Sequence, residues 1–226
     1  MSEKHEIQIE EKIDFLKDLL LKMVTRVEEA ILKATVAFRD HDVSMAEKVV
    51  ADDFYIDEMR ELIENDAVML LISEAPYGHY MRYVIAGLKM VTSLERMGDH
   101  AAHLARLTAS MSTAQKTCDA EIVKKIVAMA NADAAMFREV INALATTDAK
   151  KAREISKMDN EIDQMEEAIY CLIFAANARC SQDGEASSEL FEFYYITKEL
   201  ERLGDHVTTI CKWIVYMQEG EKPQLN

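Results

Sequence analysis

Apolar residues recur at intervals of three and four over most of the chain, with charged and polar residues between them. This spacing places the apolar side chains on one face of an α-helix, so it predicts helices that bury one side. The first such stripe consists of Leu16, Leu19, Leu20, Met23, Val27, Ile31 and Ala34.

Polar breaks divide the first half of the chain into three helical stretches. The pattern predicts helices over residues 7–39, 43–73 and 79–110. Asp42 is a candidate N-cap of the second helix, and Ser44 with the glutamate three residues later forms a competing capping box. Because a helix of about 30 residues is ~45 Å long, the predicted unit is an elongated bundle.

A segment of the third predicted helix occurs twice. Leu94-Glu-Arg-Met-Gly-Asp-His100 returns as Leu200-Glu-Arg-Leu-Gly-Asp-His206, at an offset of 106 residues. Without any gap, the same offset pairs Asp53-x-x-Ile-Asp57 with Asp159-x-x-Ile-Asp163. Matches that hold one register over so long a stretch indicate an internal repeat.

The repeat predicts the domain organisation. We expect a first three-helix repeat over residues 1–111 and a second over residues 112–226. Short links make successive helices antiparallel neighbours. The predicted fold is therefore all-α: two tandem, pseudo-symmetric three-helix bundles with six long helices, lying end to end or side by side.

Composition supports a helical fold. The 226 residues include only six glycines and two prolines, and no proline lies between Pro76 and Pro223. Sheet folds need frequent turns, which use the special backbone angles of these two residues. Four of the six glycines form repeat pairs, namely Gly78 with Gly184 and Gly98 with Gly204.

Charge and hydrophobicity narrow the class of protein. The formal net charge is −15 and no basic stripe occurs, which disfavours nucleic-acid binding. The N-terminus lacks the apolar segment of a signal peptide, and the longest uncharged apolar run, residues 168–176, is about half of the ~20 residues that span a membrane. The four cysteines lack metal-ligand spacing, and we expect them to be reduced. We therefore expect a cytoplasmic protein, peripheral to a membrane at most.

Each copy carries two acidic pairs at i, i+4 spacing, and each pair shares one helix face. In the first copy these are Asp53 with Asp57 and Glu95 with Asp99. The two pairs lie symmetrically about Pro76, so antiparallel folding at that loop brings them to the same height. The second copy repeats the arrangement about a loop beside Gly184, with Asp159, Asp163, Glu201 and Asp205.

Three further acidic residues are weaker candidates for the same clusters. Glu61 and Glu167 extend the stripe on the second helix of each copy, and Glu28 on the first helix reaches the same height. The second copy lacks the equivalent of Glu28, so we expect its cluster to have fewer ligands from the first helix. The matching stretch there carries Asn131, Asp133 and, in place of Glu28, Ala134.

Four neighbouring carboxylates need compensation, because like charges repel and burial raises the cost. Protonation, arginine partners such as Arg96 and Arg202, or bound cations would each provide it. Carboxylate clusters in helix bundles suit hard or borderline divalent metals, whereas solvated acidic pairs that bind nothing are the alternative. Gly98 and Gly204 lie within helices, where Gly costs ~1 kcal/mol relative to Ala, so we expect close helix approach or room for a ligand there.

Other polar and apolar features have more than one interpretation. His100 and His206 follow the aspartate of the repeated motif by one residue, so we expect them to face a neighbouring helix. Residues 168–176 are expected in the core or in a subunit contact, to which Tyr194 and Tyr195 would contribute. We find no phosphate-binding loop, so the sequence does not predict direct phosphate binding.

The doubled Glu-Arg-Met/Leu-Gly-Asp-His segment, with Asp-x-x-x-Asp upstream of each, resembles the PhoU family of phosphate-specific transport accessory proteins. The resemblance covers essentially the whole chain, including the closing Ile210-Cys-Lys-Trp-Ile-Val-Tyr-Met-Gln-Glu-Gly220. It implies a pair of three-helix bundles, the fold that the residues themselves predict.

The resemblance also implies a function. It predicts a non-enzymatic, cytoplasmic regulator of phosphate uptake and phosphate homeostasis that represses the phosphate-starvation response. The implied partners are a phosphate ABC transporter and a membrane sensor kinase, and we expect a homodimer. Some members bind multinuclear iron or zinc clusters through E/D-x-x-x-D motifs, which correspond here to the eight carboxylates of the acidic pairs.

Two other functions are open at this point. A di-metal carboxylate enzyme or metal store of the ferritin-like kind needs Glu-x-x-His pairs in the bundle core, and this chain contains none. A purely structural helical interaction module, with solvated acidic faces, is the other alternative.

Overall fold

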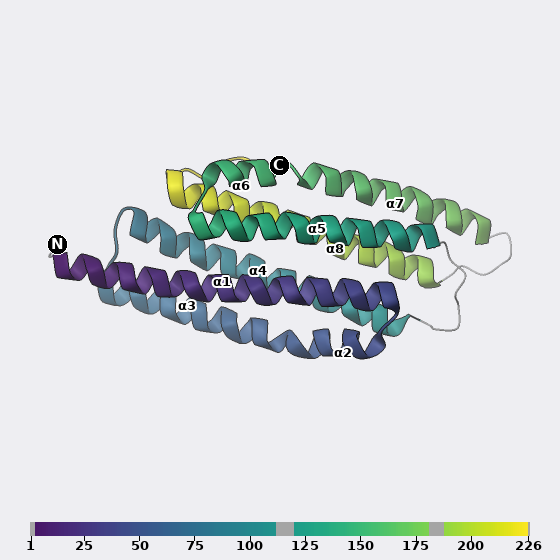
Figure 1. The fold of residues 1–226 in the computed structure, drawn as a ribbon, viewed down its shortest axis with the longest axis horizontal. Helices are drawn as coiled ribbons and strands as arrows, with labels where there is room; N and C mark the ends of the chain where they lie inside the picture. Colours follow the sequence, from purple (N-terminus) through teal and green to yellow (C-terminus); the bar gives the residue numbers. More distant parts are fainter. Residues whose placement is uncertain (1–2, 112–119, 181–187, 226) are drawn as a thin grey trace.

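The computed structural model describes residues 3–111, 120–180 and 188–225, and the regular secondary structure in these ranges is helical. The first repeat contains α1 (Glu3–Asp40), α2 (Val43–Asp52), α3 (Phe54–Glu74) and α4 (His79–Ser110). The second repeat contains α5 (Ala120–Thr146), α6 (Ala149–Ile155), α7 (Asp159–Cys180) and α8 (Ser188–Glu219). Figure 1 shows α2 and α3 following one another along one side of the first bundle, as α6 and α7 do in the second.

The prediction of two tandem three-helix bundles is confirmed, with one refinement. The second helix of each repeat is divided into two segments instead of running unbroken. The division between residues 111 and 112 stays a prediction, because it adjoins the stretch 112–119 outside the described residues. Gly184, at the second hairpin loop, also lies outside them.

The turn after the first helix has the same structure in both repeats. His41 and Thr147 both have a left-handed backbone with φ 53°. The side chains of the next residues, Asp42 and Asp148, each accept a hydrogen bond from the backbone N–H three residues later, at 2.9 Å. Asp42, and not Ser44, is therefore the N-cap of the second helix.

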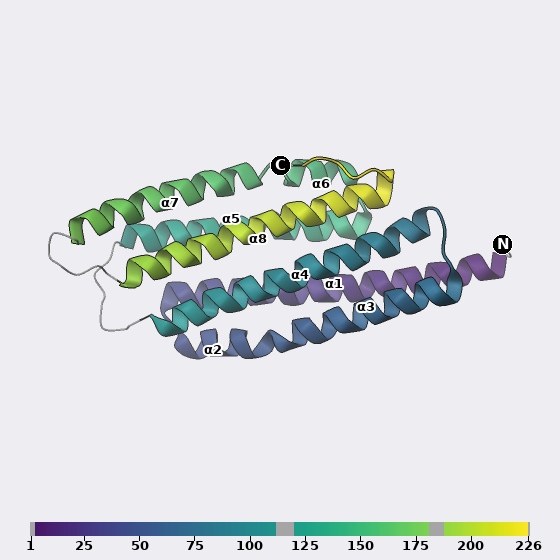
Figure 2. The ribbon, with the colours of Figure 1, turned by 180° about the vertical axis from the view of Figure 1, so that it is seen from behind.

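The two bundles lie side by side along their long axes (Figures 1 and 2). α4 packs against α8 and α1 against α5, while α2–α3 and α6–α7 cover opposite outer sides. α4 and α8 run in opposite directions (Figure 2). Equivalent residues of the two repeats therefore meet near the middle of this contact.

One continuous apolar core joins the bundles. It includes the predicted stripe on α1. The seven residues of that stripe, the first of which is Leu16 and the last Ala34, are all buried. Phe38 of α1 meets Phe193 of α8 edge to face, with ring centroids 6.1 Å apart. Because this contact is fully buried, the repeats are held together mainly by apolar packing.

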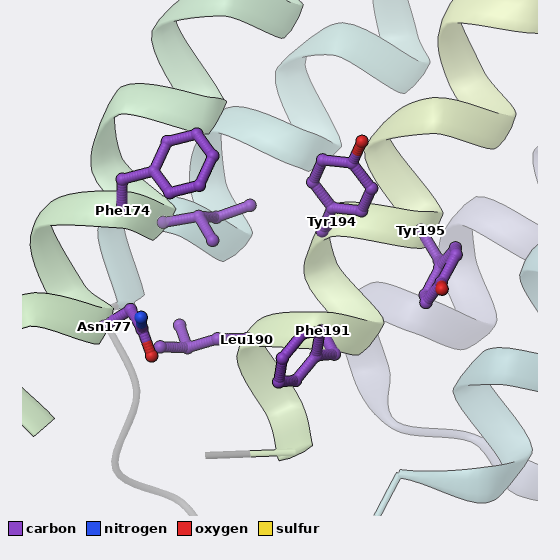
Figure 3. A pocket seen from close by; sticks show the side chains of 7 residues that line it. Phe174, Asn177, Leu190, Phe191, Tyr194 and Tyr195 are labelled. Atoms are coloured by element: carbon purple, nitrogen blue, oxygen red, sulfur yellow. The ribbon is translucent and has the colours of Figure 1, made fainter. Parts of the chain in front are cut away.

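The apolar run at residues 168–176 is only partly in the core. Ile169, Ile173 and Ala176 are buried, whereas the Phe174 side chain is 64% exposed. Phe174 lies beside a groove that is continued by aromatic side chains of α8 (Figure 3). The groove of about 320 Å³ is lined by Ile173, Phe174, Asn177, Leu190, Phe191, Tyr194 and Tyr195.

Two further properties follow from the described residues. No helix there is long and apolar enough to cross a membrane. Cys171 and Cys211 are free thiols, the first exposed and the second buried.

Candidate functional site

In each repeat, the break in the second helix falls at the first aspartate of the acidic motif. Asp53 lies between α2 and α3, and Asp159 is the first residue of α7. Helix N-termini carry unpaired N–H groups and a partial positive charge, which favour a carboxylate at this place. The next motif residues, Asp57 and Asp163, lie one turn further on and are exposed. The break therefore separates an inner aspartate from an outer one in each cluster.

The glycines of the facing helices make room for the inner aspartates. A Cβ atom at Gly98 would lie 3.2 Å from Asp53 Oδ1, and one at Gly204 would lie 2.7 Å from Asp159 Oδ1. At Gly98 the added atom would also lie 2.9 Å from Ile56 Cδ1. The expected close approach of helices at these glycines is confirmed.

The first cluster lies between α3 and α4 and contains its own cations. Burial raises the pKa of Asp53 to about 6, and the charges of Asp99 and Asp57 add to this effect while Arg106 opposes it. Burial and Asp99 also raise the pKa of Glu95, and Arg60 opposes them. Arg60 Nη1 lies 3.6 Å from Glu95 Oε1. The four predicted carboxylates are thus close enough to interact.

The second cluster lies between α7 and α8, and its four predicted carboxylates interact in a similar way. Burial raises the pKa of Asp159 to about 6, with further contributions from Asp163, Asp205 and Glu201. Glu201 Oε2 pairs with Lys198 Nζ at 2.7 Å. The structure therefore brings together both predicted sets of four residues.

A fifth carboxylate, Asp133 of α5, lies against the second cluster. Its side chain is 2% exposed, and neither of its oxygens has a hydrogen-bond partner among the described residues. Burial raises the pKa of Asp133 well above its ordinary value, and the charges of Asp159 and Glu201 raise it further. A buried carboxylate without a partner is costly, so this group is held protonated or requires a counterion.

The sequence contained a signal for Asp133 that the carboxylate spacing alone did not select. At the repeat offset of 106 residues its equivalent is Val27, a fully buried member of the apolar stripe on α1. A charged residue at a position predicted to be buried indicates a special environment. Of the first-helix candidates in the second repeat, Asp133 is the one that reaches the cluster.

The weaker candidates lie elsewhere. Glu28 faces the other bundle, where its Oε1 accepts a hydrogen bond from Arg138 Nε of α5 at 2.7 Å. Glu61 and Glu167 are exposed to solvent. The four-residue sets and Asp133 therefore make up the candidate site.

The side chains of the second cluster suit a divalent cation by their chemistry, because carboxylate oxygens are ligands of hard and borderline metals. The orphaned oxygens of Asp133 support such a ligand, and Gly204 lets the carboxylates of Asp159 and Asp133 approach α8 closely. As the side chains stand, no three His, Cys, Asp or Glu residues in the described ranges converge as a metal site requires. A cation would therefore have to draw them together.

The repeated histidines lie at the contact between α4 and α8. His100 Nδ1 is 2.6 Å and His103 Nδ1 is 3.3 Å from the carboxylate of Glu199, which is 5% exposed. The rings of His100 and His206 stack with centroids 5.4 Å apart. The expected polar contact to a neighbouring helix is confirmed for His100, and its partner Glu199 was not predicted.

Comparisons with known proteins agree with this architecture. The family model for the PhoU domain matches residues 20–108 and again residues 126–214. The "phosphate-specific transport system accessory protein PhoU homolog" of Clostridium acetobutylicum is 30% identical over 96% of this chain and 97% of its own. Homolog 1 of Thermotoga maritima is 27% identical over 95% of this chain and 90% of its own.

A solved structure shows the same fold. The crystal structure of the phosphate transport system regulatory protein PhoU from Streptococcus pneumoniae matches with a TM-score of 0.87 and 27% identity. The match covers 96% of this chain and 100% of that one.

Proposed function

The chain belongs to the PhoU family, and from this membership we propose that it regulates phosphate transport as a non-enzymatic accessory protein. The observation that carries the proposal is the match of the PhoU domain to both repeats, in register with the internal offset. The finer proposal is that it acts in the cytoplasm as a negative regulator and represses the phosphate-starvation response when phosphate is plentiful.

We propose a phosphate ABC transporter and a membrane sensor kinase as its partners. Regulation of this kind needs a surface that binds one state of a partner better than another. The exposed side chains of Phe174, Phe191 and Tyr195, together with Met69 and Ile72 of α3, provide apolar surface for such contacts or for a homodimer.

We further propose that the carboxylate clusters bind a divalent cation such as iron or zinc. In the second cluster Asp133, Asp159, Glu201 and Asp205 would hold it, and the cation would supply positive charge that relieves their repulsion. These residues come from α5, α7 and α8. Their shared ligand would therefore tie the three helices of one bundle together and fix the faces that it presents to partners.

A complementation experiment tests the function. In a strain that lacks its own PhoU protein, the wild-type chain is expected to restore repression of a phosphate-starvation reporter in high phosphate and to capture transporter subunits in a pull-down. Metal content is measured on the same purified sample. The cluster variant Asp159→Asn is compared with Glu167→Gln, which changes an exposed acid on the same helix.

The outcomes separate the alternatives. Repression and capture by the wild type, with a loss only in Asp159→Asn, would support the regulator and the role of its cluster. Failure of the wild-type chain to repress the reporter in any phosphate condition would refute the proposed regulation. Oxygen consumption or peroxidase turnover by the iron-loaded protein, lost in Asp159→Asn, would favour the ferritin-like alternative.

A further inference from the structure

A second cavity lies at the contact between the repeats, beside the second carboxylate cluster. It has a volume of about 470 Å³, within the range of small-molecule sites. α4 and α8 line it, and they run in opposite directions here (Figure 2). The lining side chains are Arg96, His100, Arg202, Asp205, His206, Thr208, Thr209 and Lys212.

The two repeats contribute equivalent residues to this cavity. Arg96 and Arg202 are related by the offset of 106 residues, as are His100 and His206. The stacked histidine rings show that the pseudo-twofold axis relating α4 to α8 passes close by. The axis therefore relates two equivalent sides of this contact, and both arginines line the cavity.

An internal carboxylate occupies one side of the axis. There the carboxylate of Glu199 on α8 lies beside the Nδ1 atoms of His100 and His103. The Glu199 side chain is 7% exposed. The equivalent of Glu199 on the other side is Ser93 of α4. A serine side chain is short and uncharged, so it cannot supply the carboxylate that His206 would meet by symmetry. The cavity lies on this second side, next to His206.

In the described part of the chain no carboxylate forms a direct ion pair with the cations of the cavity, although the charge of Arg96 acts on Glu95. Within the described ranges none of Arg96, Arg202 and Lys212 forms an ion pair or a side-chain hydrogen bond. Asp205 is the one acidic side chain among the lining residues.

A buried hydroxyl adds a neutral group to the cavity wall. Thr208 is 2% exposed, and its Oγ1 has no hydrogen bond of normal geometry in the described part of the chain. It lies close enough to Asp159 to lower the pKa of that carboxyl. Thr208 therefore connects the wall of the cavity to the carboxylate cluster.

We infer that this cavity binds the phosphate group of a small anion, in the place that Glu199 fills on the opposite side. Two guanidinium groups and an ammonium group match the geometry and charge of a phosphate dianion. The shared chemistry is that of free inorganic phosphate and of a phosphorylated small molecule. The binding site follows from this geometry alone, whereas a role in sensing phosphate abundance rests on the regulation proposed above.

Matched variants test the site in protein freed of metal with EDTA, which excludes binding through a cation. Lys212→Gln removes one cation of the cavity, and Lys48→Gln is its control, because Lys48 is an exposed lysine of α2 that does not line the cavity. Ser93→Glu places a carboxylate where the repeat offset puts Glu199, and is expected to fill the cavity from within. Circular dichroism and thermal unfolding establish that each variant folds.

Calorimetric titration with inorganic phosphate, and in a second arm with ATP, measures binding. We expect saturable binding of at least one of them, weakened about tenfold or more in Lys212→Gln and unchanged in Lys48→Gln. Folded Ser93→Glu is expected not to bind. Tighter binding of inorganic phosphate would identify free phosphate as the ligand, and tighter binding of ATP would identify a phosphorylated small molecule.

Two results would overturn the inference. One is the absence of saturable binding of both probes to the wild-type protein. The other is an equal loss of binding in Lys212→Gln and Lys48→Gln, which would show that general surface charge attracts the anion. Because these titrations use purified protein, a failure of the reporter experiment leaves their outcome unaffected.

Discussion

The two carboxylate clusters share their motif but differ in what lies beneath it. In the first repeat α1 carries the buried Val27, and Arg60 and Arg106 offset part of the negative charge of the first cluster. At the position of Val27 the second repeat places Asp133, whose oxygens have no partner among the described residues. The second cluster also has a cation, Lys198 beside Glu201, but it holds one more buried carboxylate than the first.

The difference shows that sequence symmetry does not give functional symmetry. Both inner aspartates have a pKa of about 6, so the four-residue sets of the two repeats are alike in this respect. The added buried carboxylate changes the charge that must be compensated within α5, α7 and α8. The second bundle is therefore the better candidate for a cation whose binding stabilises the fold.

The largest expected effect comes from giving the first bundle the second bundle's buried acid. Val27→Asp puts a carboxylate at a fully buried position without a hydrogen-bond partner built for it. We expect it to lower the free energy of unfolding of the metal-free protein by about 3 kcal/mol or more. Urea denaturation followed by circular dichroism measures the change, and a loss below 1 kcal/mol, on the order of an exposed substitution, would contradict the comparison.

The reverse exchange is expected to stabilise the folded state of the metal-free protein. Asp133→Val replaces the partnerless acid with an apolar side chain of similar size, the residue that the first repeat carries. In metal-free protein near neutral pH, the free energy of unfolding should rise by about 1–3 kcal/mol, the usual cost of an unsatisfied buried polar group. The same denaturation series measures it, and destabilisation would show that Asp133 has a partner that stabilises the fold without metal.

Substitution of the glycine that faces each cluster is expected to have a smaller effect on stability, and it also distinguishes the two clusters. Gly204→Ala directs a Cβ at Asp159 Oδ1 at 2.7 Å, whereas Gly98→Ala meets Asp53 Oδ1 at 3.2 Å and the end of Ile56 at 2.9 Å. Alanine favours the helix by ~1 kcal/mol, and steric strain of about 1–3 kcal/mol opposes this gain. We expect thermal unfolding to show a loss in both variants, and a cation-dependent change only for Gly204→Ala. Stabilisation of both would mean that the helices have room to separate.

The pH dependence is expected to be the mildest difference. A raised pKa means that the native state binds the proton more tightly than the unfolded state, so this stabilisation is present at low pH. It is lost as pH rises from the unfolded value of ~4 to the folded value of about 6 for Asp53 and Asp159. Asp133, whose pKa is raised further, extends the loss to higher pH.

Chelated wild-type protein should therefore lose stability between about pH 4 and pH 6 and beyond, and Asp133→Val should lose less at the upper end. Urea midpoints measured across this range provide the test. Identical profiles for the two proteins would contradict a raised pKa at Asp133.

Much of the fold was predictable because long helices depend on local patterns. The stripe from Leu16 to Ala34 and the doubled motif at Leu94 and Leu200 were sufficient for two three-helix bundles. The break at Asp53 was not, since no Gly or Pro marks it. Side-by-side packing of the bundles also depends on contacts across more than 100 residues, such as Phe38 with Phe193.

The sequence predicted the residues of the candidate site that occur in both repeats, and it did not predict those that occur in only one. The i, i+4 pairs gave both four-residue clusters, because spacing on a helix fixes which residues share a face. Asp133 and Glu199 break the symmetry, and their repeat equivalents are Val27 and Ser93. Whether such a residue points inward depends on the helices around it, which the spacing of one helix does not reveal.

The most direct test of the central claim is the shift in melting temperature that a divalent cation produces. Chelated wild-type protein, Asp133→Val and the first-cluster variant Asp57→Asn are each titrated with zinc and with ferrous iron under anaerobic conditions. If the buried excess of carboxylate draws the cation to the second bundle, the wild type and Asp57→Asn gain several degrees and Asp133→Val gains little. An equal shift in all three proteins, or none in the wild type, would contradict the account.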